Sequence, residues 1–158
     1  METLKLDKPT AMKLYPEVPS WFQEVLTNSF GTTVKGHILD RINSVEDALK
    51  EADTETRNDY LQAISGYTTP DRIAEENIKL IIKVVNEGTK FDFSDRSQKK
   101  WFPVFYWSPG VGFVFSYSHY YFFDRTYTYS GSRLCFLDEK RCETIAKRFI
   151  KEYNTMLL

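Results

Sequence analysis

The first 98 residues place apolar side chains mainly at helical spacing. Asp7 stands before Pro9, which suits the first turn of a helix because proline has no N–H to leave unpaired, and this helix is predicted to end near Leu14. A second helix is predicted from about Ser20, with Gly31 just past its end. Its predicted buried face consists of Trp21, Phe22, Val25, Leu26 and Ser29. We interpret residues 1–31 as a short helical docking unit.

Residues 32–98 are predicted to be a further helical part. Ser44 is a suitable cap for one helix, because acidic residues follow it and favour the positive end of the helix dipole. The polar stretch 53–59 is predicted to be an exposed turn, and a weak helix is expected between it and Gly66.

The clearest helix signal in this part begins at Thr69. A proline and an acid follow this residue, as is typical of a helix N-terminus, and Gly88 marks the expected end. The apolar stripe is wide, which indicates cover on more than one side. It consists of Ala74, Ile78, Ile81, Ile82 and Val85, with Ile73, Leu80 and Val84 beside it. We expect this central helix to pack on a sheet formed later in the chain.

Strand signals dominate residues 99–137, for which we predict an antiparallel β-meander of three to four strands. The first strand spans 101–107, where Pro103 favours an edge position or a bulge. A turn is predicted at 108–110. The next strand, 112–118, alternates in sequence, which predicts Phe113, Phe115 and Tyr117 on one face and small residues on the other.

The remaining elements complete the predicted fold. A loop or bulge is expected at 119–124, followed by strands at 125–130 and 132–137. Asp138 is the expected cap of a C-terminal helix over 138–158, whose apolar positions are Cys142, Ile145, Ala146, Phe149, Ile150 and Tyr153. The prediction is one α+β domain over 1–158, with the meander packed against two amphipathic helices and a helical N-terminal half.

Composition adds one unusual property, which is a surplus of rings. Hydrophobic residues make up 42% and charged residues 27% of the 158 residues, while aromatic residues reach 16%. Fourteen of the 29 residues from Trp101 to Tyr129 are Phe, Trp or Tyr. Rings of this size must be buried or bound to something, because each covers about 150–250 Å². We favour burial beneath the two helices over an exposed stacking platform.

Net charge, hydropathy and cysteine content give limited information about partners and cellular location. The net charge of −1 gives no overall attraction to nucleic acid or to an anionic membrane. The sequence shows no leader-like apolar region and no stretch of about 18 apolar residues, so neither secretion nor a membrane span is expected. Cys135 and Cys142 are expected to be reduced and buried, although a bridge between them remains open from sequence alone.

Patterns of catalysis and metal binding are weak. His37 and His119 lie far apart and no Cys/His ligand spacing occurs, so no metal and no cofactor are expected. A small pocket near His119, Asp124 and Arg125 is the weakest hypothesis, because neighbours in sequence do not supply catalytic geometry. We therefore expect a protein that is not an enzyme.

Binding through the surplus rings is the stronger hypothesis. A protein partner, or self-association, is expected at a candidate surface formed by Tyr106, Tyr120, Tyr121, Phe122 and Arg125, because aromatic residues are enriched at interfaces. The alternative is a platform for single-stranded nucleic acid, where rings stack on bases and cations bind phosphates. That platform consists of Tyr117, Tyr127, Tyr129, Lys99, Lys100 and Arg133.

Several short segments, in the same order along most of the chain, resemble a family of small uncharacterised proteins from phages, prophages and mobile elements of gut Bacteroidetes. They are residues 11–16, 40–42, 45–48, 86–88, 101–105 and 131–136. Thr89 and Val104 depart from the family pattern, which often has an aromatic residue at both positions. The resemblance implies a phage or prophage setting, with location in the bacterial cytoplasm or in the phage particle. It implies no activity and no catalytic residue.

Overall fold

The computed structural model describes residues 6–67, 69–95, 97–121 and 134–158. These residues form a mixed α+β structure, with eight α-helices and a two-stranded antiparallel sheet. The chain divides into two compact units, Met1–Arg41 and Ile42–Leu158. The prediction of a single domain over 1–158 stays a prediction. None of the described helices is both long and apolar enough to cross a membrane.

The N-terminal unit is built from short helices. They are α1 (Lys8–Leu14), the 3-10 turn Tyr15–Glu17, α2 (Ser20–Phe30), the 3-10 turn Thr32–Lys35 and α3 (Ile38–Arg41). Asp7 caps α1 by accepting a hydrogen bond from the Thr10 N–H at 2.9 Å, and Pro9 lies in the first turn, as the sequence indicated. The small core of this unit consists of Ala11, Leu26 and Val34, with partly buried side chains packed around it.

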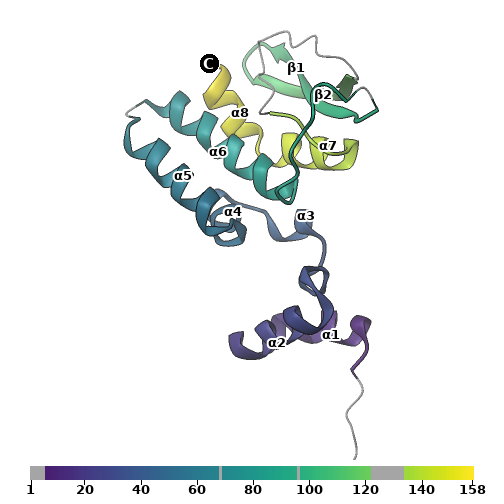
Figure 1. Cartoon of the computed structure of the whole chain (residues 1–158). Helices are drawn as coiled ribbons and strands as arrows, with labels where there is room; N and C mark the ends of the chain where they lie inside the picture. Colours follow the sequence, from purple (N-terminus) through teal and green to yellow (C-terminus); the bar gives the residue numbers. More distant parts are fainter. Residues whose placement is uncertain (1–5, 68, 96, 122–133) are drawn as a thin grey trace, which may run out of the picture. The chain divides into compact units, whose positions relative to one another are not determined.

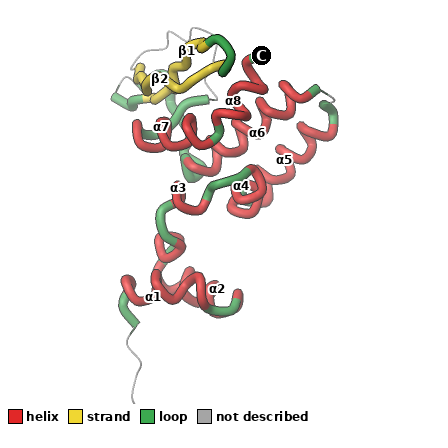
Figure 2. The backbone as a smooth tube through the Cα atoms, turned by 180° about the vertical axis from the view of Figure 1, so that it is seen from behind, coloured by secondary structure: helices red, strands yellow, loops and turns green. Residues whose placement is uncertain are grey.

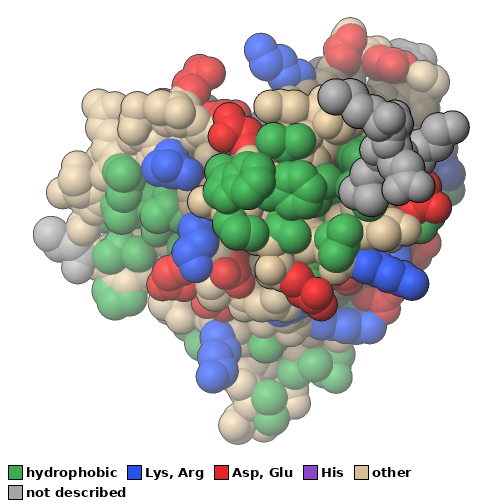
Figure 3. Space-filling view, turned by 90° about the horizontal axis from the view of Figure 1, so that it is seen from below, with side chains coloured by type: hydrophobic (Ala, Val, Ile, Leu, Met, Phe, Trp, Pro, Cys, Tyr) green, Lys and Arg blue, Asp and Glu red, His purple; other side chains and the backbone are tan. Residues whose placement is uncertain are grey.

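The predicted buried face of α2 is wrong in part. Leu26 is buried, but Trp21 is 67% exposed and Val25 is 46% exposed. The helix therefore turns the Leu26 side toward the core, and the apolar pair one turn apart faces outward. Figure 3 shows the molecule from below, with hydrophobic side chains coloured green among the charged ones.

The second unit begins with helices whose starts are set by side-chain caps. The Asp47 N–H donates to the Ser44 hydroxyl at 3.1 Å and opens α4 (Val45–Glu51), as predicted. The Thr56 N–H donates to the Asp53 carboxylate at 2.6 Å and opens α5 (Thr54–Ser65). The predicted exposed turn at 53–59 is thus wrong, because Asp53 acts as an N-cap and the polar residues after it are the first turns of α5.

Helix α6 (Pro70–Val85) begins at the predicted residue and ends at Val85, before the predicted end at Gly88, and it buries the predicted stripe apart from Ile73. Its buried residues are Ala74, Ile78, Leu80, Ile81, Ile82, Val84 and Val85. The helix packs mainly against α4, α5 and α8 (Ile150–Leu157). It is therefore not the helix that covers the sheet, in contrast to the expectation from sequence, and its wide stripe is used by three helical neighbours.

The sheet is a hairpin of β1 (Lys100–Ser108) and β2 (Gly112–Tyr121). The predicted turn at 108–110 is confirmed, with the Val111 N–H donating to the Ser108 carbonyl at 3.1 Å. Strand β2 runs on through residues 119–121, the first part of the segment 119–124 where a loop or bulge was predicted. A meander of three to four strands is not shown: the predicted strand 125–130 lies outside the described residues, and so do the first two residues of the predicted strand 132–137. Of its described part, 134–137, Phe136 pairs in an isolated bridge with Trp101.

Two C-terminal helices cover one face of the hairpin. Asp138 caps α7 (Glu139–Arg148), as predicted, but the helix breaks at Phe149 before α8 begins. Both α7 and α8 contact β2, and α7 also contacts β1. Figure 1 shows the hairpin lying on these two helices, with α6 beside α8 and α5 beyond it. The back view in Figure 2 shows the hairpin turn beside the end of α8.

Candidate functional site: the aromatic hairpin

The register of the hairpin assigns each side chain to one of two faces, because directly opposed residues of an antiparallel pair share a face. Phe105 lies opposite Phe115, with the two ring centroids 6.2 Å apart. The Phe105 ring also lies 4.7 Å from that of Tyr153, which is buried on α8. This face therefore packs against the helices, and we call it the inner face. Its opposed pairs are Trp107–Phe113, Phe105–Phe115, Pro103–Ser118 and Trp101–Tyr120.

A β-bulge changes the face of the residues after it. The register shifts between Val104 and Phe105, so that Val104 lies opposite Tyr117, Phe105 lies opposite Phe115, and Ser116 is the extra residue. The alternation predicted for 112–118 is therefore wrong beyond Phe115. Tyr117 lies on the outer face and is 54% exposed, while the Ser118 hydroxyl oxygen is buried on the inner face.

The outer face carries most of the open rings. Tyr106 lies opposite Val114 and is 53% exposed, and it is the diagonal neighbour of Tyr117. His119 is exposed and belongs to the same face, with its ring centroid 6.4 Å from that of Tyr117. At the rim, Trp107 and the turn residue Val111 are also exposed. Partial burial beneath helices thus describes the inner rings Phe105 and Phe115, whereas the inner-face rings Trp107 and Tyr120, 53% and 36% exposed, and the outer rings are open.

The hairpin surface has almost no charge of its own. Residues 101–121 contain no Asp, Glu, Lys or Arg. Lys100 begins β1 but is only 2% exposed, because its Nζ donates to the Asp95 carbonyl at 2.9 Å and lies 5.3 Å from the Phe93 ring. Lys99 lies with its Nζ 4.7 Å from the ring of Tyr120, an inner-face residue. Neither lysine is on the outer face with Tyr106 and Tyr117.

The structure regroups the residues predicted for binding. Tyr106, from the protein-contact surface, and Tyr117, from the nucleic-acid platform, share the outer face, whereas Tyr120 packs on the inner face with its ring 4.9 Å from Trp101. Tyr121 ends β2. The other predicted members lie outside the described residues: Phe122, Arg125, Tyr127, Tyr129 and Arg133. Asp124, predicted beside His119, lies outside them too.

A side-chain clamp that the sequence did not indicate fixes the turn end of the hairpin. The Asn154 amide on α8 accepts from the Phe113 N–H at 2.6 Å and donates to the Phe113 carbonyl at 2.8 Å. Gly112 makes this approach feasible, since a Cβ there would lie 2.5 Å from Asn154 Oδ1. The amide thus hydrogen-bonds Phe113 as a neighbouring strand would.

A second amide clamp joins α6 to the chain that follows the hairpin. Asn86, itself 2% exposed, donates to the Cys135 carbonyl at 2.8 Å and accepts from the Leu137 N–H at 3.1 Å. The segment it holds includes Phe136, whose N–H donates to the Trp101 carbonyl at 2.8 Å and whose carbonyl accepts from the Trp101 N–H at 3.0 Å. The two clamps fix the hairpin to the helices at opposite ends.

The buried titratable groups near the hairpin are suited to packing rather than to chemistry. Both cysteines are free and buried, and burial raises the pKa of the Cys135 and Cys142 thiols to about 12. Burial likewise raises the pKa of the Tyr153 hydroxyl. Thiols of this kind are almost entirely protonated at neutral pH, and a protonated thiol is a poor nucleophile.

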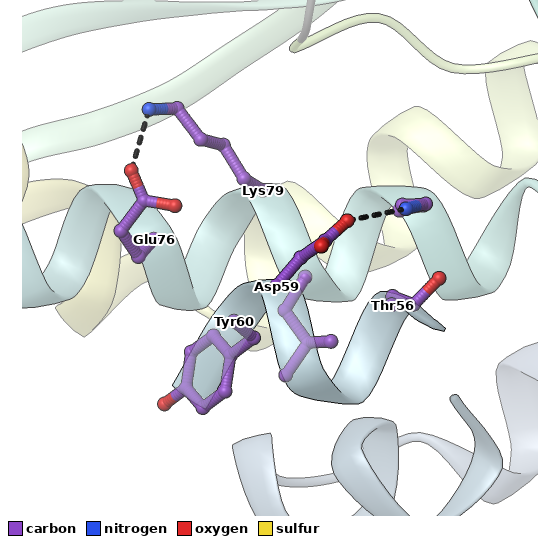
Figure 4. Close-up of a pocket in the computed structure, with 7 residues that line it drawn as sticks. Thr56, Asp59, Tyr60, Glu76 and Lys79 are labelled. Carbon is purple, nitrogen blue, oxygen red and sulfur yellow. Dashed lines mark hydrogen bonds and ion pairs between the residues drawn. The ribbon is translucent and has the colours of Figure 1, made fainter. Parts of the chain in front are cut away.

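Two clefts of the second unit are weaker candidates for a binding site than the hairpin, because they are small or shallow. One lies between α5 and α6, encloses about 100 Å³ and is drawn in Figure 4. In this cleft the Lys79 ammonium lies 2.7 Å from the Glu76 carboxylate, and the Lys83 ammonium lies 3.7 Å from the Asp59 carboxylate. The charged side chains that line the cleft therefore neutralise one another. Ligand pockets usually hold about 300–1,000 Å³. A shallow groove of about 340 Å³ between α6 and α8 is near the lower end of that range.

Comparison with known proteins adds no assignment. No protein-family model, no curated protein and no solved structure matches this chain. Within the described ranges, no group of three or more His, Cys, Asp or Glu side chains is arranged to hold a metal ion.

Proposed function

We propose that this chain is a non-enzymatic binding or assembly protein that contacts another protein through the open side of its β1–β2 hairpin. The observation that carries the proposal is the half-exposed state of the outer-face rings Tyr106 and Tyr117, at 53% and 54%. Aromatic residues are enriched in protein–protein interfaces, where a ring contributes a large contact area at little cost in conformational entropy.

The lack of charge on the hairpin favours a protein partner over nucleic acid. Binding of a single strand needs cations beside the rings to neutralise phosphates. Lys100 is bonded to the Asp95 carbonyl, and Lys99 lies on the inner-face side. The centre of a protein interface, in contrast, is depleted of charged residues and rich in rings.

The setting we propose is the cytoplasm of a bacterium that carries a phage or prophage, or the phage particle itself. This part of the proposal rests on the resemblance to proteins of phages and mobile elements. It makes a phage or host protein, or a second copy of this chain, the partner to look for.

Site-specific photo-crosslinking tests the proposal. A photoreactive phenylalanine analogue replaces Tyr117 in the full chain, which is expressed in bacteria that carry the phage or prophage. The same analogue at Tyr67, an exposed residue on another part of the molecule, is the matched control. The expected result is a discrete protein adduct from position 117 and none from position 67. Equal adducts at both positions, or none at either, would contradict the proposal.

Single-stranded nucleic-acid binding is the alternative. An oligonucleotide titration at two salt concentrations separates it from the leading proposal, because phosphate contacts strengthen as salt falls. Tight binding at low salt that is lost in Tyr117→Ser would move the alternative to first place.

A further inference from the structure

Three polar side chains lie in the buried layer between the hairpin and the C-terminal helices. Tyr153 of α8 is 2% exposed, and its hydroxyl has no hydrogen-bond partner among the described residues. The Ser118 hydroxyl of β2 is buried and has no partner among them either. Cys142 of α7 is fully buried, and its thiol is free. Each of the three elements thus contributes one polar group to this layer.

The packing of strand and helices brings these groups together. Ser118 belongs to the inner-face pair next to Phe105 along the hairpin. The Tyr153 ring lies 4.7 Å from the Phe105 ring, which places it beneath this part of the sheet. Helices α7 and α8 contact each other, and both contact β2. Burial raises the pKa of the Tyr153 hydroxyl, and the nearby Cys142 adds to that rise. Burial also raises the pKa of the Cys142 thiol, and the nearby Ser118 hydroxyl opposes that rise.

Two unpaired hydroxyls are unfavourable in a layer of this kind. Burial of a hydroxyl without a hydrogen bond costs free energy, and buried polar groups in folded proteins nearly always have a protein or water partner. A thiol is only a weak donor and a weak acceptor, so Cys142 alone is a poor partner for both hydroxyls. Buried waters typically make about three hydrogen bonds to polar groups that would otherwise be unsatisfied.

We propose that one buried water molecule is bound between the hydroxyls of Tyr153 and Ser118, with the Cys142 thiol as its third partner. The water would accept a hydrogen bond from the Tyr153 O–H. It would donate one proton to the Ser118 oxygen and the other to the Cys142 sulfur, which is a weak acceptor. Both hydroxyls would then be satisfied. This inference does not depend on the proposed function.

The bound water would join β2 to both helices directly after the bulge. Ser118 is the first inner-face residue after the extra residue Ser116, and Tyr117 between them lies on the outer face. A slip of one residue would exchange the faces of Ser118 and Tyr117. Such a slip would also take the Ser118 hydroxyl away from the water. The water would therefore stabilise the register that leaves Tyr117 open.

Tyr153→Phe in the full chain tests the proposal by the sign of its effect. Removal of a hydroxyl that bonds a water should lower the urea midpoint, whereas removal of an unsatisfied hydroxyl should raise it. Ser118→Ala should lower the midpoint too, and the double variant should lose less than the two single losses together, because both act through one water. Tyr106→Phe, in an exposed ring, is the matched control and should leave the midpoint unchanged. An unchanged or raised midpoint in Tyr153→Phe would overturn the proposal.

A crystal structure of the full chain that shows ordered water separates a bound water from a direct contact. The expected result is one water oxygen about 2.5–3.0 Å from the hydroxyl oxygens of both Tyr153 and Ser118. The same water should disappear or lose occupancy in crystals of Tyr153→Phe. A direct hydrogen bond between Tyr153 and Ser118, or a cluster without water in the wild type, would overturn the proposal.

Discussion

The inner and outer faces of the β1–β2 hairpin are built from the same two strands, yet they contribute differently to the molecule. On the inner face, Phe105 and Phe115 pack together and against Tyr153. On the outer face, Tyr106 and Tyr117 are more than half exposed. Both faces are aromatic, so composition does not distinguish a core ring from a surface ring. The difference comes from the helices that cover one face only.

The β-bulge at Ser116 determines which of the two faces carries Tyr117. In a regular strand without the bulge at Ser116, Tyr117 would continue the inner series of Phe113 and Phe115. The bulge moves it to the outer face beside Tyr106. A one-residue change of register exchanges the faces of every later side chain, so the bulge determines which tyrosine is open.

The largest expected effect is on the reactivity of the two buried thiols, which tests whether the core beneath the inner face excludes solvent. At pH 8 a thiol with a pKa of about 12 has about a thousandfold less thiolate than one near 9, so Cys135 and Cys142 should react with a thiol reagent about a thousandfold slower in the native chain than in urea. The two thiol pKa values are raised in the folded state only, so above pH 9 the unfolded chain loses these protons first and is favoured. The free energy of unfolding should fall as pH rises from about 9 toward 12. Rapid native labelling at pH 8 would contradict burial.

The next effect compares neighbours that face opposite sides. Phe105→Ala removes a ring that contacts Phe115 and Tyr153 and should lower the free energy of unfolding by about 3 kcal/mol. Tyr106→Ala, the matched control, should cost less than about 1 kcal/mol, because its ring is half exposed. Urea denaturation measures both. Equal losses would show that the faces do not differ as described.

A smaller effect is expected when the hairpin loses its clamp on the inner side. Asn154→Ala leaves the Phe113 N–H and carbonyl without their partner, and we expect a loss of about 2 kcal/mol in urea unfolding. Thr155→Ala is a suitable control, because its hydroxyl donates only to the Lys151 carbonyl within α8. An Asn154→Ala chain as stable as this control would show that the clamp contributes nothing.

The smallest effect is expected on the outer face itself. Tyr117→Ser should change the free energy of unfolding by less than about 0.5 kcal/mol, as for surface substitutions in general. The same substitution should nevertheless weaken binding of a protein partner. A large loss of stability measured by thermal unfolding would instead assign Tyr117 to the core.

Sequence reasoning located elements whose ends have local signals. Ser44 and Asp138 were identified as caps, and the helix that begins after Thr69 buries its predicted stripe apart from Ile73. It missed the start of α5, because the N-cap Asp53 stands in a polar stretch that also fits a turn. It misjudged Trp21, because an apolar stripe does not say which of its sides a small unit buries.

The candidate site was harder to predict for a physical reason. Tyr106 and Tyr117 were identified as binding residues, but in different sets, because the bulge at Ser116 has no signal in the sequence. The sequestration of Lys100 and the amide clamps of Asn86 and Asn154 depend on contacts between residues far apart in the chain. Periodicity and composition do not encode such contacts.

Hydroxyl-radical footprinting of the dilute wild-type chain is the most direct test of the central claim, that one aromatic face is closed and the other open. Tyr106 and Tyr117 should be oxidised rapidly, while Tyr153, 2% exposed beneath the inner face, should be protected. Oxidation of Tyr153 at the rate of Tyr117 would contradict the account, and so would protection of all three.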